Sequence, residues 1–127
     1  MSICIQKHCR LSRGPEDGFR ILAMRYWPRG VRRDHFDIWH RDLAPSAKLL
    51  HWCRAQEKNS AAASAAYAVE WRARYIEEMR AQDELIVELR RRHAEGETLT
   101  LLCACHDPLK CHRTVLRDLI LEGIDSA

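Results

Sequence analysis

The sequence predicts an α/β fold, a small three-layer domain in which helices flank a mainly parallel sheet. Apolar, strand-like runs at 2–6, 19–24 and 99–103 are interspersed with helical patterns, in the order strand, strand, helices, strand, helix. The last two strands are separated by helices, which favours a parallel pair joined by a right-handed crossover. No linker or internal repeat divides the 127 residues, so we expect a single domain over 1–127.

The second strand should end before the Trp-Pro-Arg-Gly segment at 27–30. Pro28 cannot donate a hydrogen bond to a strand ladder, and Gly30 permits the positive φ of a turn. The next residues, 34–43, are ambiguous, because their apolar spacing fits either a short strand or one helical turn.

Helical patterns follow up to residue 96. Ser46 is a candidate N-cap for the first helix, which should give way to a polar connection at 54–60. An alanine-rich run from Ala61 favours a second helix. Asp83 is a candidate cap for the third, and Gly96 suits the position just past its end. Core packing is expected for the aromatic stripe of the second helix, which comprises Tyr67, Trp71 and Tyr75.

The most unusual segment is the window 103–113, Cys-Ala-Cys-His-Asp-Pro-Leu-Lys-Cys-His-Arg. It lies between the last strand and a final helix expected from about 110 to 122, and it holds three of the six cysteines and two of the seven histidines. Soft and titratable side chains gathered at such a turn indicate a metal site or an activated thiolate. The alternative is structural, because cysteine is among the most buried residue types and Cys103 continues a buried strand.

A metal site would use Cys105, His106 and Cys111 as candidate ligands. Zinc is the candidate metal, since it prefers thiolate and imidazole in a tetrahedral set. The spacing Cys-x-Cys-x5-Cys-His, however, is not that of a standard zinc knuckle.

A reactive thiol is the second interpretation of the same window. Cys111 precedes the final helix, and Lys110 and Arg113 flank the Cys-His pair. Helix amino ends and neighbouring cations both favour thiolate over thiol. Cys111 is therefore a candidate nucleophile, Cys105 its candidate redox partner, and His112 a candidate acid/base.

The basic residues are concentrated near the amino terminus. From Lys7 to Arg33 there are eight basic residues against two acidic ones, which gives +6 in a chain whose net charge is +3. Such a field favours an anionic partner, either a small phosphorylated ligand or nucleic acid, unless the arginines pair with acidic residues of the helices. The candidate anion-binding residues are Arg25, Arg29, Arg32 and Arg113, with Trp27 either stacking on a ligand or plugging the loop onto the core.

Composition also bears on the cellular setting. No stretch of the sequence approaches the apolar length that crosses a bilayer. The first residues lack the charged start and apolar run of a secretory signal, so six cysteines indicate a reducing, cytoplasmic environment rather than a disulfide framework.

Three segments resemble a known family. Residues 19–31, Phe-Arg-Ile-Leu-Ala-Met-Arg-Tyr-Trp-Pro-Arg-Gly-Val, resemble the "RILVxRxWPRGV" signature of the YeaO-like proteins. Residues 43–46 resemble their "LAPS" step, and residues 98–116 resemble their final strand and helix. The chain is therefore similar, from about residue 2 to 121, to members of the domain of unknown function (DUF) family 488.

This resemblance implies a single small α/β domain of the family-488 type, and it brings no established activity. It also divides the cysteine window. Cys111, His112 and Arg113 look like the element that one branch of the family shares, whereas Cys105 stands where an acidic residue is common in that branch. Met24 is a second departure, because many members carry Asp there.

Two function classes follow from the sequence. The first is a cytosolic α/β protein whose crevice binds a phosphate- or nucleotide-like anion between the arginines and the Cys-His-Arg element, with or without catalysis. The second is a binding module for a metal ion or nucleic acid that turns nothing over. Parallel strands would bring both segments to the carboxyl edge of the sheet, where open α/β sheets bind ligands.

Overall fold

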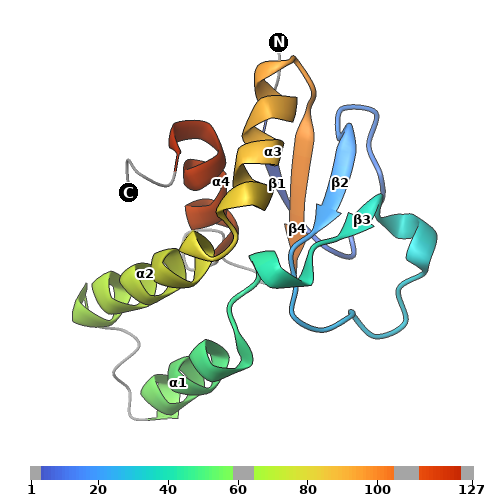
Figure 1. Cartoon of the computed structure of the whole chain (residues 1–127). Helices are drawn as coiled ribbons and strands as arrows, with labels where there is room; N and C mark the ends of the chain where they lie inside the picture. The colour runs from blue at the N-terminus through green and yellow to red at the C-terminus, as the bar shows by residue number, and fades with distance from the viewer. Residues whose placement is uncertain (1–3, 59–64, 105–111, 124–127) are drawn as a thin grey trace.

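The computed structural model describes residues 4–58, 65–104 and 112–123, with only the backbone at 4–8 and 65. A four-stranded sheet lies at its centre, in the order β1-β4-β2-β3, and each pair of neighbouring strands is parallel (Figure 1). The strands are β1 (Cys4–His8), β2 (Phe19–Leu22), β3 (Ile38–Trp39) and β4 (Leu99–Cys103). The predicted α/β class with a parallel sheet is confirmed.

Four α-helices are described. They are α1 (Ala47–Lys58), α2 (Ala65–Arg80), α3 (Asp83–Ala94) and α4 (His112–Glu122). Short 3₁₀ helices at Arg33–His35 and Arg41–Leu43 flank β3, so the ambiguous stretch contains both a strand and helical turns. No helix among the described residues has the length and apolar character needed to cross a membrane.

The two faces of the sheet bury different partners because successive strand residues point to opposite sides. Ile21 and Leu101 belong to the large core that the four helices cover. Leu22 and Leu102 belong to a smaller cluster on the other face, where Phe36 and Trp27 from the loop after β2 pack against them. The layers are thus the helices, the sheet, and a covering of loop that includes one short 3₁₀ helix.

Most of the helix ends predicted from local sequence signals are confirmed. The Leu49 N–H donates to Ser46 Oγ at 3.0 Å, which confirms the cap of α1. Gly96 has φ +98° just past α3, as expected. The cap prediction at Asp83 is wrong: Gln82 is the N-cap residue, and Asp83 starts the helix, where its negative charge faces the positive end of the helix dipole.

The polar connection predicted from residue 54 is also wrong as far as Lys58, because α1 continues to that residue. Residues 54–58 are Arg, Ala, Gln, Glu and Lys, which all favour helix, and Cys53 just before them is buried. Polarity marked an exposed helical turn here rather than a loop.

Candidate functional site

Three strands deliver their carboxyl ends to one edge of the sheet. Cys9 follows β1, and its N–H donates to the carbonyl oxygen of Cys103 at the end of β4, at 2.9 Å. Ala23 follows β2, and its N–H donates to the Leu102 carbonyl oxygen, also at 2.9 Å. This edge is where parallel α/β sheets leave room for ligands.

His112, the first residue of α4, lies at this edge and is 7% exposed. Its Nε2 is 2.5 Å from the carbonyl oxygen of Ala23. Because a carbonyl oxygen only accepts, Nε2 carries the hydrogen, and Nδ1 is the ring nitrogen that can accept or release a proton. The ring of Tyr75 lies 5.8 Å away, and the Tyr75 hydroxyl donates to the Leu43 carbonyl oxygen at 2.6 Å. The imidazole is therefore held in one orientation by α2 and the end of β2.

Arg113, the next residue, is 2% exposed, and the first turn of α4 contains no acidic side chain. Its positive charge affects the pKa of the Cys9 thiol. Burial raises the pKa of the Cys9 thiol above its ordinary value, and the charges of Arg10 and Arg113 offset part of that increase. Cys9 therefore remains a thiol at neutral pH. The first turn of α4 carries two buried side chains that can be charged, His112 and Arg113.

The sequence-predicted chemistry falls partly outside the described residues. Cys105, His106 and Cys111 all lie there, so their roles remain predictions. Among the residues that the structure does describe, no group of three His, Cys, Asp or Glu side chains could hold a metal ion. Cys103 is buried in β4, as its position in an apolar strand predicted.

The predicted cationic residues of the loop after β2 have different surroundings. The Arg25 guanidinium donates to the carbonyl oxygens of Pro45 and Ala44, both at 3.1 Å, and to Asp42 Oδ1 at 3.3 Å. Arg25 thus clamps the turn that precedes α1. Arg32 is exposed and 3.4 Å from Asp34.

Arg29 is exposed on the same loop, and its carbonyl oxygen accepts a hydrogen bond of 2.9 Å from Arg10 Nη2. Arg10 therefore ties the end of β1 to the Trp-Pro-Arg-Gly loop. Reading the sequence did not single out Arg10 or Cys9, because no motif marks them; only the strand order places them beside β4.

Trp27 plugs the loop onto the sheet. Its Nε1 donates to the Val31 carbonyl oxygen at 2.8 Å, and its ring meets those of Phe36 and Trp39 edge to face, with both centroid separations at 5.4 Å. Pro28 beside it is buried. The plug interpretation is confirmed, although one side of the ring lines an open groove.

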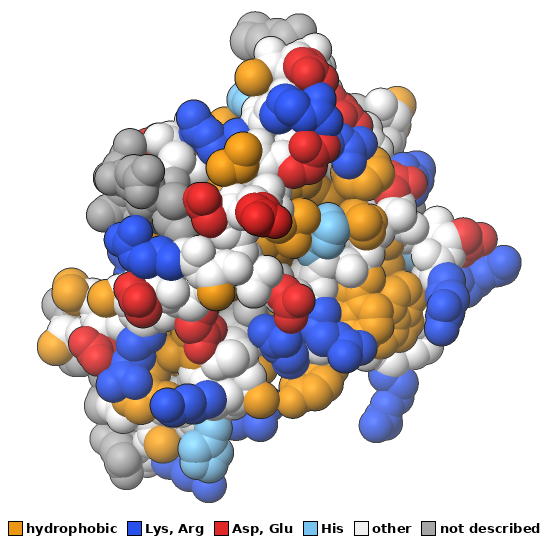
Figure 2. Space-filling view, viewed as in Figure 1, with side chains coloured by type: hydrophobic (Ala, Val, Ile, Leu, Met, Phe, Trp, Pro, Cys, Tyr) orange, Lys and Arg blue, Asp and Glu red, His pale blue; other side chains and the backbone are white. Residues whose placement is uncertain are grey.

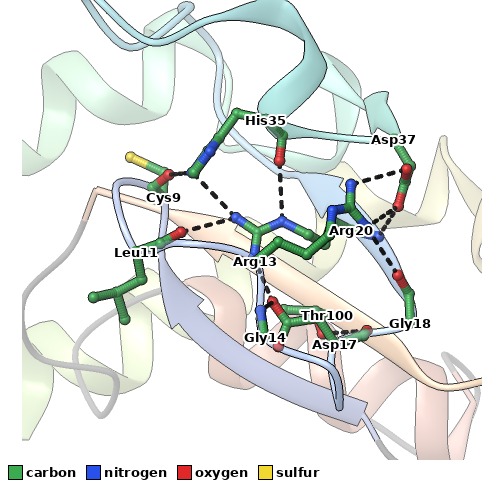
Figure 3. Close-up of polar contacts among 10 residues, drawn as sticks. All are labelled: Cys9, Leu11, Arg13, Gly14, Asp17, Gly18, Arg20, His35, Asp37 and Thr100. Carbon is green, nitrogen blue, oxygen red and sulfur yellow. Dashed lines mark hydrogen bonds and ion pairs between the residues drawn. The ribbon is translucent and has the colours of Figure 1, made fainter.

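The loop face contains a buried ion pair that the sequence did not predict. Asp17 and Arg20 are fully buried and joined through Oδ2 and Nη1 (Figure 3). Arg20 Nε donates to the His35 carbonyl oxygen and Nη2 to that of Leu11, each at 3.0 Å. One arginine thus fastens the loops on both sides of β2.

The network extends in both directions along the sheet (Figure 3). Thr100 Oγ1 donates to the Asp17 carbonyl oxygen at 2.6 Å, and the Arg20 N–H donates to Asp37 Oδ2 at 2.7 Å. Gly18 has φ +61°, and a Cβ there would overlap the carbonyl oxygen of Thr98. A basic residue within the apolar run at 19–24, with an acid three positions earlier, was the signal that could have revealed the pair.

Comparison with known proteins shows the family. The family model described as the active DUF488-N3 subclade matches residues 5–123. The chain belongs to this family. It is 32% identical over 108 residues to an uncharacterised protein of Mycobacterium tuberculosis (strain ATCC 25618 / H37Rv), which covers 84% of this chain and 83% of the relative. It is also 32% identical over 104 residues to the uncharacterised protein YeaO of Escherichia coli (strain K12), covering 80% and 83%. No solved structure matches the chain.

These relatives confirm the family resemblance that the three sequence segments indicated. Because both relatives are uncharacterised, they supply no activity. The residues at the carboxyl edge of the sheet are therefore the basis for a proposed function.

Proposed function

We propose that the protein binds a small phosphorylated or nucleotide-like anion at the carboxyl edge of its sheet, and that the Cys-His-Arg element at 111–113 acts on it. The observation that carries the proposal is the position of Arg113. Arg113 is 2% exposed and lies in the first turn of an 11-residue helix that begins at the edge where the parallel strands end.

The chemistry of this position favours an anion. A guanidinium presents a planar fork of N–H donors that matches two oxygens of a phosphate or carboxylate. The amino end of a helix adds outward-pointing N–H groups and a partial positive charge. No carboxylate stands in the first turn of α4 to oppose them, so all local charges of that turn have the sign that attracts an anion.

The neighbouring groups support a reaction rather than binding alone. His112 is fixed through Nε2, and we assign to its imidazole the proton transfer to or from a bound group. Cys111 precedes it in the sequence, and cations on both sides of the Cys-His pair favour its thiolate. The proposed roles are therefore anion binding for Arg113, acid/base catalysis for His112 and nucleophilic attack for Cys111.

Calorimetric titration of the full chain with inorganic phosphate, pyrophosphate and adenosine monophosphate tests the proposal. Arg113→Gln should weaken binding by about tenfold or more, because a charge-assisted bidentate contact is lost. Arg80→Gln is the matched control: Arg80 is a half-exposed arginine at the end of α2, paired with Glu77, and its loss should leave affinity unchanged. Thermal unfolding of both variants separates lost binding from lost folding.

Two results would reject the proposal: no anion binds the wild-type protein at millimolar concentration, or the Arg113→Gln variant binds as tightly as wild type. Cys111→Ser then separates an enzyme from a protein that binds the anion without turning it over. An enzyme should keep anion affinity in this variant and lose turnover of the phosphorylated compound that it hydrolyses or transfers. Retained turnover would remove Cys111 from the mechanism and leave anion binding in place.

A further inference from the structure

An aromatic groove lies on the loop face of the sheet, and neither His112 nor Arg113 lines it. It encloses about 380 Å³ and is lined by Trp27, Arg33, Phe36, Asp37, Ile38 and Trp39. Over β3 and the loop that precedes it, Figure 2 shows hydrophobic side chains with Lys and Arg side chains on both sides. The groove therefore combines ring surfaces with positive charge.

The two indoles are held rigidly. Trp27 Nε1 donates to the Val31 carbonyl oxygen at 2.8 Å, and Trp39 Nε1 donates to that of Met24 at 2.7 Å. The rings stand at 72° to each other, and both remain partly exposed. A planar ligand that stacks here meets surfaces that need no ordering, which lowers the entropic cost of binding.

The acidic residues of this region are already engaged. Asp37 receives two hydrogen bonds from the Arg13 guanidinium, at 3.0 and 3.1 Å, and Asp34 is 3.4 Å from Arg32. Arg33 lines the groove, and the Arg41 guanidinium carbon lies 4.4 Å from the centroid of the Trp39 ring. Across residues 4–58, 65–104 and 112–123, neither Arg33 nor Arg41 forms a salt bridge, so the groove keeps a net positive rim.

We propose that this groove binds single-stranded nucleic acid, with a base stacked on the exposed indole surface and the backbone phosphates against Arg33 and Arg41. Every base has a π-face, and an arginine fork matches phosphate oxygens, so both features of the groove are used. An acidic peptide would use only the arginines, and a duplex would hide its base faces. This inference concerns a different surface from the anion site and does not depend on it.

Fluorescence anisotropy of the full chain with a labelled oligo(dT) of about 15 nucleotides measures the affinity. With two phosphates neutralised by Arg33 and Arg41, log K should fall against log salt with a slope of about −1.4, or about sevenfold from about 50 to about 200 mM. Arg33→Gln should weaken binding and reduce that slope by about 0.7.

The chain offers a matched control on its helical side. Trp52 also carries a guanidinium carbon 4.4 Å from its ring centroid, that of Arg74, and Trp52 packs against the helix-face core. Oligo(dT) should quench part of the indole fluorescence. Trp39→Phe should abolish most of that quenching and weaken binding by about fivefold or more. Trp52→Phe and Arg74→Gln should both keep the quenching by oligo(dT) and the affinity of the wild-type chain.

The proposal is overturned if oligo(dT) does not bind or if the affinity is independent of salt. It is overturned as well if the Trp52 and Arg74 variants lose as much affinity for oligo(dT) as the groove variants. It is also overturned if poly-glutamate displaces oligo(dT) with an equal salt slope and Trp39→Phe has no effect, since the groove would then bind acidic protein. Should Trp39→Phe fail to fold, Arg33→Gln and Arg41→Gln decide the question against Arg74→Gln.

Discussion

The two faces of the sheet are stabilised in different ways. On the helix face, Ile21 and Leu101 enter a continuous apolar core with all four helices. On the loop face, the residues next to them in sequence, Arg20 and Thr100, are buried in hydrogen bonds to loop atoms and to Asp17. Apolar contacts are non-directional, whereas hydrogen bonds and ion pairs fix geometry.

This difference shows how a layer of loops can have as well-defined a geometry as a layer of helices. A loop has few backbone hydrogen bonds of its own, so a buried side chain must supply them. Arg20 does so for the carbonyl oxygens of Leu11 and His35, on either side of its strand. The aromatic groove belongs to this layer, so its shape depends on these polar bonds as well as on the apolar cluster around Leu22 and Leu102.

The largest effect is expected from a substitution that disrupts the loop face directly. Arg20→Met removes one partner of a fully buried ion pair and should cost about 3–5 kcal/mol in the free energy of unfolding, because the Asp17 carboxylate is left buried without its counter-charge. Denaturant unfolding measures it. The double change Asp17→Asn with Arg20→Met should recover part of the loss. A cost of Arg20→Met below about 1 kcal/mol would show that the apolar cluster alone holds this layer.

A smaller effect is expected where polar bonds occur in the helical layer. Ser46 caps α1 through the Leu49 N–H, and its own N–H donates to Glu78 Oε1 at 2.8 Å. Ser46→Ala should cost about 1 kcal/mol of unfolding free energy, and Ser46→Thr, which keeps a capping oxygen, should cost less. A cost for Ser46→Ala as large as that for Arg20→Met would erase the contrast between the faces.

The smallest effect concerns the rim of the loop face and depends on pH. Burial raises the pKa of Asp37, but hydrogen bonds from Arg13 and from the Arg20 N–H, with the charges of both arginines, hold it below its ordinary value. A lowered folded-state pKa contributes stability above the unfolded value of about 4, and that contribution is lost as pH falls through the folded value. Because this pair is partly exposed, the contribution should stay below about 1 kcal/mol.

Urea unfolding midpoints of the wild-type chain and of Asp37→Asn, measured from about pH 6 down to about pH 3, check this sign. The wild type should lose more stability than the variant over the acidic part of this range, and the two should run parallel near neutrality. Parallel curves throughout would mean that the Arg13–Asp37 pair does not stabilise the loop face.

Much of the helical side was readable from local patterns. The strand at 99–103 matches β4, the Ser46 cap matches the start of α1, and Tyr75 in the aromatic stripe is buried in the core. These features depend on periodicity and on neighbours a few residues away. The continuation of α1 through 54–58 was missed because polar composition cannot distinguish an exposed helix face from a loop.

The site was readable only in part, because its members are far apart in sequence. His112 and Arg113 stand out in a motif, but their positions depend on Ala23 and on the end of β1, which no spacing predicts. Arg25 illustrates the opposite case: its motif suggested a ligand, whereas its hydrogen bonds go to the 42–45 turn. Whether an arginine meets a ligand or a carbonyl depends on which chain segment is adjacent.

The α/β class, the family and the Cys-His-Arg element could be predicted from the amino-acid sequence, since each depends on local periodicity or on a short motif. Two features required the folded structure: the strand order, which brings Cys9 and Arg10 beside β4, and the burial of Arg20 with Asp17 on the loop face. A buried charged side chain needs hydrogen-bond partners besides its counter-charge, and those of Arg20, the carbonyl oxygens of Leu11 and His35, come from two loops that only the packed chain brings together.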